Sequence, residues 1–210
     1  MTELLIQKND EKKQIALVEN GKLIEYYEED ENTHRREGNI YIGIVKDIIK
    51  GMQSAFVDIG TEKNSFIHLK DILPKIDQTK EEQNSNIDIS DMIQPNQKIL
   101  VQVKKDSNEK KGARVSTHIN LPSKYIVLMP NTDIITISQK IEDETEQKRL
   151  IKLVKDNLSK GNGAIIRTSA QGKGEEIIED IKQIEDKWNK IIQTSINPCL
   201  LYTSPSPRDA

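Results

Sequence analysis

The chain has almost no cysteine to cross-link it and only a small net charge. Its 210 residues include one cysteine, which excludes an internal disulfide framework and a zinc site made only of cysteines. No apolar run is long enough to cross a membrane or to serve as a secretory signal, and this favours a soluble cytoplasmic protein. The formal net charge is -3, so any affinity for a polyanion has to come from locally patterned charge.

Aromatic residues are also scarce, at 4% of the chain, so the positions of the two phenylalanines are informative. Side chains alternate across a strand, and in the segment 54–59 Phe56 falls on the face opposite the apolar row. Phe66 does the same in the segment 65–69. Exposed rings beside polar groups suit stacking on unpaired bases. Two other interpretations remain open, namely a domain that covers this face and a bulge near Gly60 that returns one ring to the core.

The segments around the two rings predict a small β-barrel. A strand at 38–48 has Ile40, Ile42 and Ile44 on one face, a buried strand follows at 97–106, and a closing strand is expected at 110–117. Together with the two phenylalanine strands this makes five short strands, the number found in an oligonucleotide-binding barrel. In the closing strand, Lys111 and Arg114 are placed to neutralise phosphates near the aromatic face.

The remaining segments predict a mixed α+β chain. Strands are expected within 3–7 and 14–27, with Asn20-Gly21 as a hairpin turn, and the polar stretch 75–96 is interpreted as a surface insertion. Apolar spacing predicts helices at 142–158 and 175–193, and a strand is expected at 163–166. The acidic residues at the start of the second helix are expected to form a solvated face: Glu175, Glu176, Glu179 and Asp180.

Several blocks of the sequence resemble one family in the same order. The run from Gly51 to Gly60, Gly-Met-Gln-Ser-Ala-Phe-Val-Asp-Ile-Gly, and the later Lys-Gly-Ala-Arg at 111–114 resemble the S1-type domain of the ribonuclease E/G family. The similarity continues through residues 121–130, 137–142 and 166–170. The resemblance implies four segments: strands of an incomplete RNase H-like subdomain at 1–37, an S1-type five-stranded OB barrel at 38–118, an α/β 5′-sensor region at 119–196, and a tail at 197–210.

The same resemblance implies an endoribonuclease that cleaves single-stranded RNA in RNA processing and decay and senses a 5′-monophosphate. By resemblance, Phe56 and Phe66 anchor bases and Lys111 meets the RNA backbone. The residues matched to the 5′-phosphate site are Arg167, Thr168, Ser123 and Val127. The chain departs from the family in two places, with Ser123 where glycine is common and Gln139-Lys140 where a pair of arginines is common.

The metal chemistry of the family is expected outside this chain. In the family, two aspartates of a later domain bind Mg²⁺, and a later Cys-x-x-Cys zinc link pairs subunits into a homo-oligomer. Neither motif occurs before residue 199. These residues are therefore expected to bind single-stranded RNA, to hold no metal, and to be inactive alone.

Other interpretations remain open. The chain could be a complete, non-catalytic S1-type adaptor on RNA, or a structural domain without RNA contact. Outside the family context, Arg167-Thr168 would be an ordinary surface pair and Val127 a core strand residue. The last residues, 199–210, resemble no part of the family but do resemble a translated sequencing-library adapter; the alternative is a natural Ser/Pro-rich disordered end.

Overall fold

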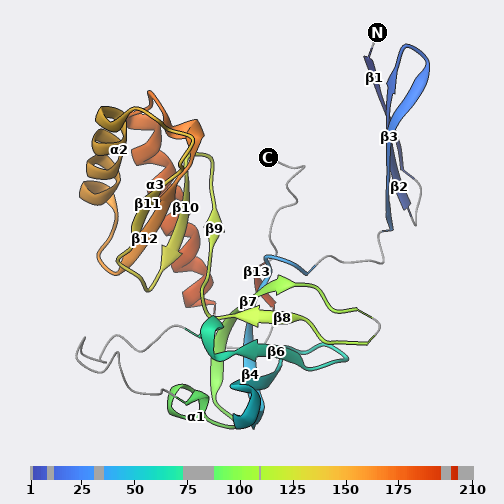
Figure 1. Cartoon of the computed structure of the whole chain (residues 1–210), viewed down its shortest axis with the longest axis vertical. Helices are drawn as coiled ribbons and strands as arrows, with labels where there is room; N and C mark the ends of the chain where they lie inside the picture. Colours follow the sequence, from blue (N-terminus) through green and yellow to red (C-terminus); the bar gives the residue numbers. More distant parts are fainter. Residues whose placement is uncertain are drawn as a thin grey trace. The chain divides into compact units, whose positions relative to one another are not determined.

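The computed structural model describes residues 2–8, 12–30, 36–72, 88–108, 110–194 and 200–202. The chain divides into two compact units, residues 1–35 and 36–210, which are described separately (Figure 1). No helix in these described ranges is long and apolar enough to cross a membrane.

The first unit is a three-stranded antiparallel sheet, and none of its side chains that the structure describes is buried. Its strands, in spatial order, are β1 (Thr2–Lys8), β2 (Lys12–Glu19) and β3 (Lys22–Asp30). The predicted hairpin turn is confirmed, because Asn20 and Gly21 join β2 to β3 with φ angles of 49° and 78°. Leu4 and Leu5 point to opposite faces of β1, and their side chains are 60% and 55% exposed. Apolar side chains are therefore exposed on both faces of the sheet.

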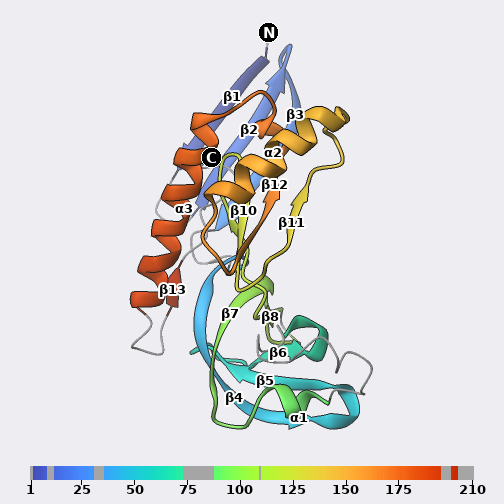
Figure 2. The ribbon, with the colours of Figure 1, turned by 90° about the vertical axis from the view of Figure 1, so that its left-hand side faces the viewer.

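The second unit begins with a closed five-stranded barrel, which confirms the predicted OB-type fold. Its strands are β4 (Ile40–Ile49), β5 (Ser54–Asp58), β6 (Ser65–His68), β8 (Arg114–Ser116) and β7 (Lys98–Lys105), and β7 pairs back onto β4. All neighbours are antiparallel except β6 and β8. Figure 2 shows the strongly curved β4 that closes the barrel. A further short strand, β13 (Leu200–Tyr202), pairs with the start of β4, so these three tail residues belong to the sheet.

The barrel core takes the face of β4 opposite Ile40, Ile42 and Ile44. Tyr41 and Val45 belong to the cluster of buried residues inside the barrel, whereas Ile40 belongs to the buried cluster of the following α/β region. Gly43 lies on the barrel side, where an added Cβ would stand 2.4 Å from a Val57 methyl group. A larger residue at position 43 would therefore collide with β5. Strand β4 serves two cores at once, which its alternating pattern alone does not reveal.

The end of the predicted insertion is part of the barrel rather than its surface. Residues 73–87 lie outside the described ranges, but the short helix α1 (Ile89–Met92) places Ile89 and Met92 in the barrel core at 0% and 6% exposure. The Gln53 side chain accepts a hydrogen bond from the Ile89 N–H at 2.9 Å and donates to Asp88 at 3.0 Å. Bonds from the Ser90 hydroxyl and from Gln53 lower the pKa of Asp88 to about 2. This glutamine ties the β4–β5 loop to the helix.

The rest of the second unit is a four-stranded sheet with two helices on one face. The elements are β9 (Leu121–Pro122), β10 (Ile126–Pro130), β11 (Ile135–Ile137), α2 (Glu144–Asn157), β12 (Asn162–Ile166) and α3 (Glu175–Gln193), with strand order β11-β12-β10-β9. Ile126, Leu128 and Ile166 share one buried cluster with Leu150 of α2 and Ile181 of α3. Both helices begin and end within two residues of the predicted bounds. The opposite face of the sheet carries the alternate residues, including Val127.

Candidate functional site

The two phenylalanines are cross-strand neighbours on the outer face of the barrel. Phe56 pairs with Phe66 in the β5–β6 register, and both rings are partly exposed. Their centroids are 6.3 Å apart with an interplanar angle of 70°, an edge-to-face contact. The flanking Val57 and Ile67 point inward and are fully buried. The predicted placement opposite the apolar row is confirmed, and no register shift between β5 and β6 returns a ring to the core. We call the side of β5 and β6 that carries these rings the ring face.

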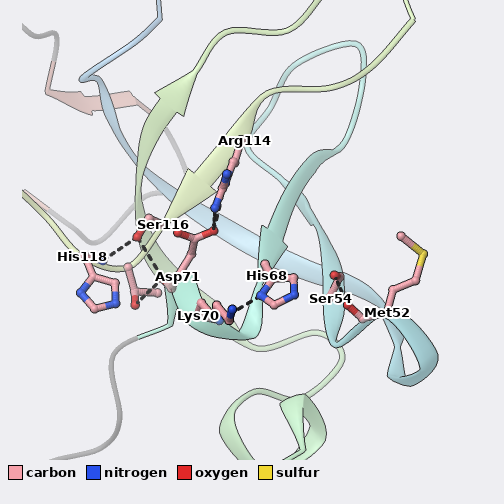
Figure 3. Close-up of polar contacts among 9 residues, drawn as sticks. Met52, Ser54, His68, Lys70, Asp71, Arg114, Ser116 and His118 are labelled. Atoms are coloured by element: carbon pink, nitrogen blue, oxygen red, sulfur yellow. Dashed lines mark hydrogen bonds and ion pairs between the residues drawn. The ribbon is translucent and has the colours of Figure 1, made fainter.

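A row of hydrogen-bonded polar groups runs along β6, β8 and the residues that follow these strands (Figure 3). Arg114 is in register with Phe66, and its guanidinium donates two hydrogen bonds, of 3.0 and 2.8 Å, to one carboxylate oxygen of Asp71. The Asp71 carbonyl oxygen accepts a hydrogen bond from the Ser116 hydroxyl at 2.9 Å. On β6, the His68 ring nitrogen Nδ1 accepts the Lys70 backbone N–H at 3.1 Å. Arg114 thus adds a cation next to Phe66, but this cation is shared with Asp71.

Lys111 lies in the β7–β8 loop, which packs directly against the start of β6. Its backbone N–H and carbonyl oxygen both bond to Asn108, at 2.7 and 2.9 Å. A Cβ on the next residue, Gly112, would stand 1.9 Å from the Asn64 carbonyl oxygen, so only glycine fits this approach. The Ala113 carbonyl oxygen accepts the Phe66 N–H at 2.7 Å. The loop that carries the exposed Lys111 is therefore attached to the strand that carries Phe66.

Burial lowers the pKa values of two basic groups near this row. Burial is the main cause that lowers the pKa of Lys104, with Asp71 opposing it. Burial, followed by repulsion from Lys104, also lowers the pKa of His118, while Asp71 and the Lys70 backbone oppose that shift. The lowered pKa favours the neutral form of His118 beside the polar row.

Arg167 and Thr168, two of the residues matched to the 5′-phosphate site, lie where β12 ends. Arg167 and Thr168 are exposed, and Thr168 begins the short helix η4 (Thr168–Ala170). The Arg167 backbone N–H donates to the Tyr125 carbonyl oxygen at 2.9 Å, and an Nη donates to the Ser123 carbonyl oxygen at 2.5 Å. The Ser169 hydroxyl donates to the Lys124 carbonyl oxygen at 2.6 Å. All three carbonyl groups of the turn at 123–125 therefore bond to residues 167–169.

Ser123 also bonds to α3, whereas Val127 lies in a pocket that Arg167 does not line. The Ser123 N–H donates to the Ile126 carbonyl oxygen at 2.8 Å, and its hydroxyl donates to a carboxylate oxygen of Asp180. Val127 is partly exposed and lines an open pocket of about 240 Å³ with seven other residues. These are Glu37, Gly38, Gln102, Val103, Lys104, Asn120 and Pro122. The pocket lies between the barrel strand β7 and the β9–β10 pair, so Val127 faces this junction rather than the helix-covered core.

The prediction of a solvent-exposed position was wrong for Asp180, which is buried. It was expected on a solvated acidic face, yet it is 8% exposed, whereas its neighbours Glu175, Glu176 and Glu179 are exposed. One Asp180 carboxylate oxygen accepts the Ser123 hydroxyl, and the other accepts the Tyr125 N–H at 2.9 Å. Its position one residue before the buried Ile181 of α3 was the available signal, since residues flanking an apolar stripe border the core.

The other departure from the family lies on the surface, and no metal centre is formed in the described ranges. Gln139 and Lys140 are both exposed in the segment that follows β11. Among the described residues, no group of three or more histidine, cysteine, aspartate or glutamate side chains is arranged to hold a metal ion.

Comparison with known proteins identifies relatives along nearly the whole chain. The model of the ribonuclease E/G family matches residues 120–208. This range extends into residues 199–208, for which the sequence predicts no resemblance to the family. Ribonuclease G of Escherichia coli (strain K12) is 38% identical over 204 residues, covering 95% of this chain and 42% of the relative. Ribonuclease G of Haemophilus influenzae is 40% identical over 195 residues, covering 91% and 40%. Ribonuclease E of a Nostoc species is 36% identical over 191 residues, covering 86% and 27%. The chain thus spans less than half the length of these curated relatives.

Proposed function

The chain belongs to the ribonuclease E/G family, and from this premise we propose that its second unit holds single-stranded RNA for an endoribonuclease acting in RNA processing and decay. The observation that carries the proposal is the ring face. Two partly exposed phenylalanines stand side by side on the outside of a closed barrel, where they add little to the barrel core.

Base stacking accounts for this placement better than packing does. The edge-to-face contact covers part of each ring and leaves the rest accessible, and successive unpaired bases can stack on such rings. Arg114 and Lys111 lie on the segments next to Phe66, so positive charge is available for the phosphates that connect the bases. Because the net charge of the chain is -3, binding of this kind is local rather than a general affinity for polyanions.

The end of β12 supplies groups suited to a terminal phosphate. Arg167 keeps guanidinium donors beyond the nitrogen bonded to Ser123, and the Thr168 hydroxyl lies beside it on the exposed start of η4. Both Ser123 donors are already used, so we propose that Ser123 acts through its carbonyl oxygen, which orients Arg167, and that Val127 lies near the first base. A 5′-monophosphate would accept its hydrogen bonds at this corner.

Holding RNA is the part of the activity assigned to these residues. The described side chains offer no set of ligands for the Mg²⁺ or Zn²⁺ expected of the longer family members. From the resemblance to the longer family members, we propose that the 210-residue protein binds RNA in the cytoplasm without cleaving it, and that the longer family form is a homo-oligomer.

A fluorescence titration of the 210-residue protein with a short unpaired RNA oligonucleotide tests the proposal. Replacing both Phe56 and Phe66 by alanine should reduce the binding free energy by about 1–3 kcal/mol for each stacked base. Replacing both by tyrosine is the matched control, because it retains the ring faces. Equal affinity of the double-alanine variant and the unaltered protein would remove the ring face from RNA binding.

A further inference from the structure

We infer that Asp180 is a positioning residue that holds Arg167 in place for a 5′-phosphate, acting through the turn at 123–125. This inference rests on the proposed function of the Arg167 corner. Asp180 itself is 8% exposed and lies on α3, behind the turn, so it has no direct access to a ligand bound on the exposed side.

The carboxylate fixes both ends of the turn. One oxygen accepts the Ser123 hydroxyl and the other accepts the Tyr125 backbone N–H at 2.9 Å. A buried carboxylate is costly unless hydrogen bonds compensate it, and these two donors provide that compensation. The Ser123 N–H, bonded to the Ile126 carbonyl oxygen at 2.8 Å, closes the turn onto β10.

The opposite side of the same turn orients the phosphate-binding groups. The Ser123 carbonyl oxygen receives an Nη of Arg167 at 2.5 Å, and the Tyr125 carbonyl oxygen receives the Arg167 N–H at 2.9 Å. An arginine side chain has several rotatable bonds, and ordering them on binding costs conformational entropy. Because one guanidinium nitrogen of Arg167 already has a fixed acceptor, less conformational freedom is lost when the remaining donors bind an anion. The turn thus links a buried carboxylate on one side to an exposed guanidinium on the other.

Ser123 joins the turn to α3 by a side-chain hydrogen bond, which glycine at this position could not make. A glycine at this position would leave one Asp180 oxygen without its side-chain donor, because only the Tyr125 N–H would remain. The Ser123 hydroxyl points to Asp180 of α3 and not to the exposed side where the ligand would bind. In this chain, α3 is coupled to the phosphate corner by a side-chain bond in addition to a backbone bond.

The test measures discrimination between two RNA ends rather than affinity alone. Dissociation constants of the 210-residue protein are measured for one short oligonucleotide carrying either a 5′-monophosphate or a 5′-hydroxyl, and their ratio is compared among variants. Asp180→Ala should reduce the ratio by about two- to tenfold while leaving the affinity for the 5′-hydroxyl oligonucleotide unchanged. Asp180→Asn should retain most of the ratio, because its amide oxygen and nitrogen can serve the Tyr125 N–H and the Ser123 hydroxyl.

Three further variants separate the possible outcomes. Ser123→Ala, which leaves the carboxylate in place, should also reduce the ratio, whereas Glu179→Ala on the exposed side of the same helix should not. Arg167→Lys serves as the reference, because it gives the ratio for a protein that lacks the guanidinium group. An unaltered ratio in both Asp180→Ala and Ser123→Ala would overturn the positioning role, as would an equal loss for both oligonucleotides. A ratio of one in the unaltered protein would overturn phosphate sensing itself and the inference with it.

Discussion

The ring face and the Arg167 corner present their exposed groups by different means. On the ring face, strand register places Phe56 opposite Phe66, and the alternation of side chains turns both rings outward. At the corner, between β12 and η4, backbone carbonyl groups of the 123–125 turn hold the side chains of Arg167 and Ser169. The ring face should therefore depend on the packing of the barrel, whereas the corner should depend on individual hydrogen bonds.

The largest expected effect comes from breaking the packing beneath the ring face. In Gly112→Ala the new Cβ would stand 1.9 Å from the Asn64 carbonyl oxygen, so the backbone must shift and the bond between Phe66 and Ala113 is lost. We expect destabilisation of about 1–3 kcal/mol or more, measured by urea unfolding followed by circular dichroism, with weaker oligonucleotide binding. Gly51→Ala is the control, because its Cβ would meet nothing within 4 Å. Equal stability of the two variants would show that the loop is not packed as described.

A smaller and more selective effect is expected at the corner. Arg167→Ala should lower the binding free energy of a 5′-monophosphorylated oligonucleotide by up to about 1.5 kcal/mol, at the low end of charged hydrogen bonds because the side chain is exposed. The same variant should bind the 5′-hydroxyl form as the unaltered protein does. Phe66→Ala, in contrast, should weaken both forms equally. Each variant is titrated with both forms of the oligonucleotide. If Arg167→Ala weakened the binding of both forms equally, the corner would not act separately from the ring face.

Barrel stability can be changed without altering the ring face. Within the described residues, the Ser65 hydroxyl is the buried side-chain group without a hydrogen-bond partner, and it lies on the barrel side of β6. Ser65→Ala removes this unpaired group, so we expect a neutral or stabilising change of up to about 1 kcal/mol in the free energy of unfolding. Oligonucleotide affinity should stay constant. A clear loss of stability in urea unfolding would indicate that the hydroxyl has a bonding partner.

The smallest expected effect is a pH dependence of stability. The folded-state pKa of His118 is lowered below its ordinary value of 6.5, chiefly by burial and then by Lys104, while Asp71 opposes the shift. The unfolded chain therefore binds the proton more readily, so the stabilisation is present above pH 6.5 and is lost as the pH falls through the folded pKa. His118→Gln should show a flatter decline of the urea midpoint below pH 6.5 than the unaltered protein. An identical decline in both proteins would exclude His118 as its source.

The repeating patterns of the sequence predicted most elements of the fold. Period-two alternation located β4 to β7 and assigned the outward faces of Phe56 and Phe66, and helical spacing located α2 and α3. These assignments succeed because local periodicity reports which face of an element is buried. Short-range turn chemistry was equally informative at Asn20-Gly21.

The errors fall where two parts of the chain meet. Ile89 and Met92 stand at the end of a polar stretch, so their burial in the barrel is not visible from local composition. The isoleucine face of β4 serves a second core, because Ile40 packs with the α/β region. Asp180 was assigned to a solvated acidic face because its neighbours are charged, and only its donors on the 123–125 turn explain its burial.

The sequence by itself determined the family, the barrel, and the side of the strands on which the two rings lie. Those features follow from motifs and from alternation along short segments. The tertiary structure alone decided that the Ser123 hydroxyl faces Asp180 and that the carbonyl groups of the same turn hold Arg167. These contacts join residues 44 and 57 positions apart, and a hydrogen bond between such distant residues is set by the packing of α3 against the sheet, not by any pattern along the chain.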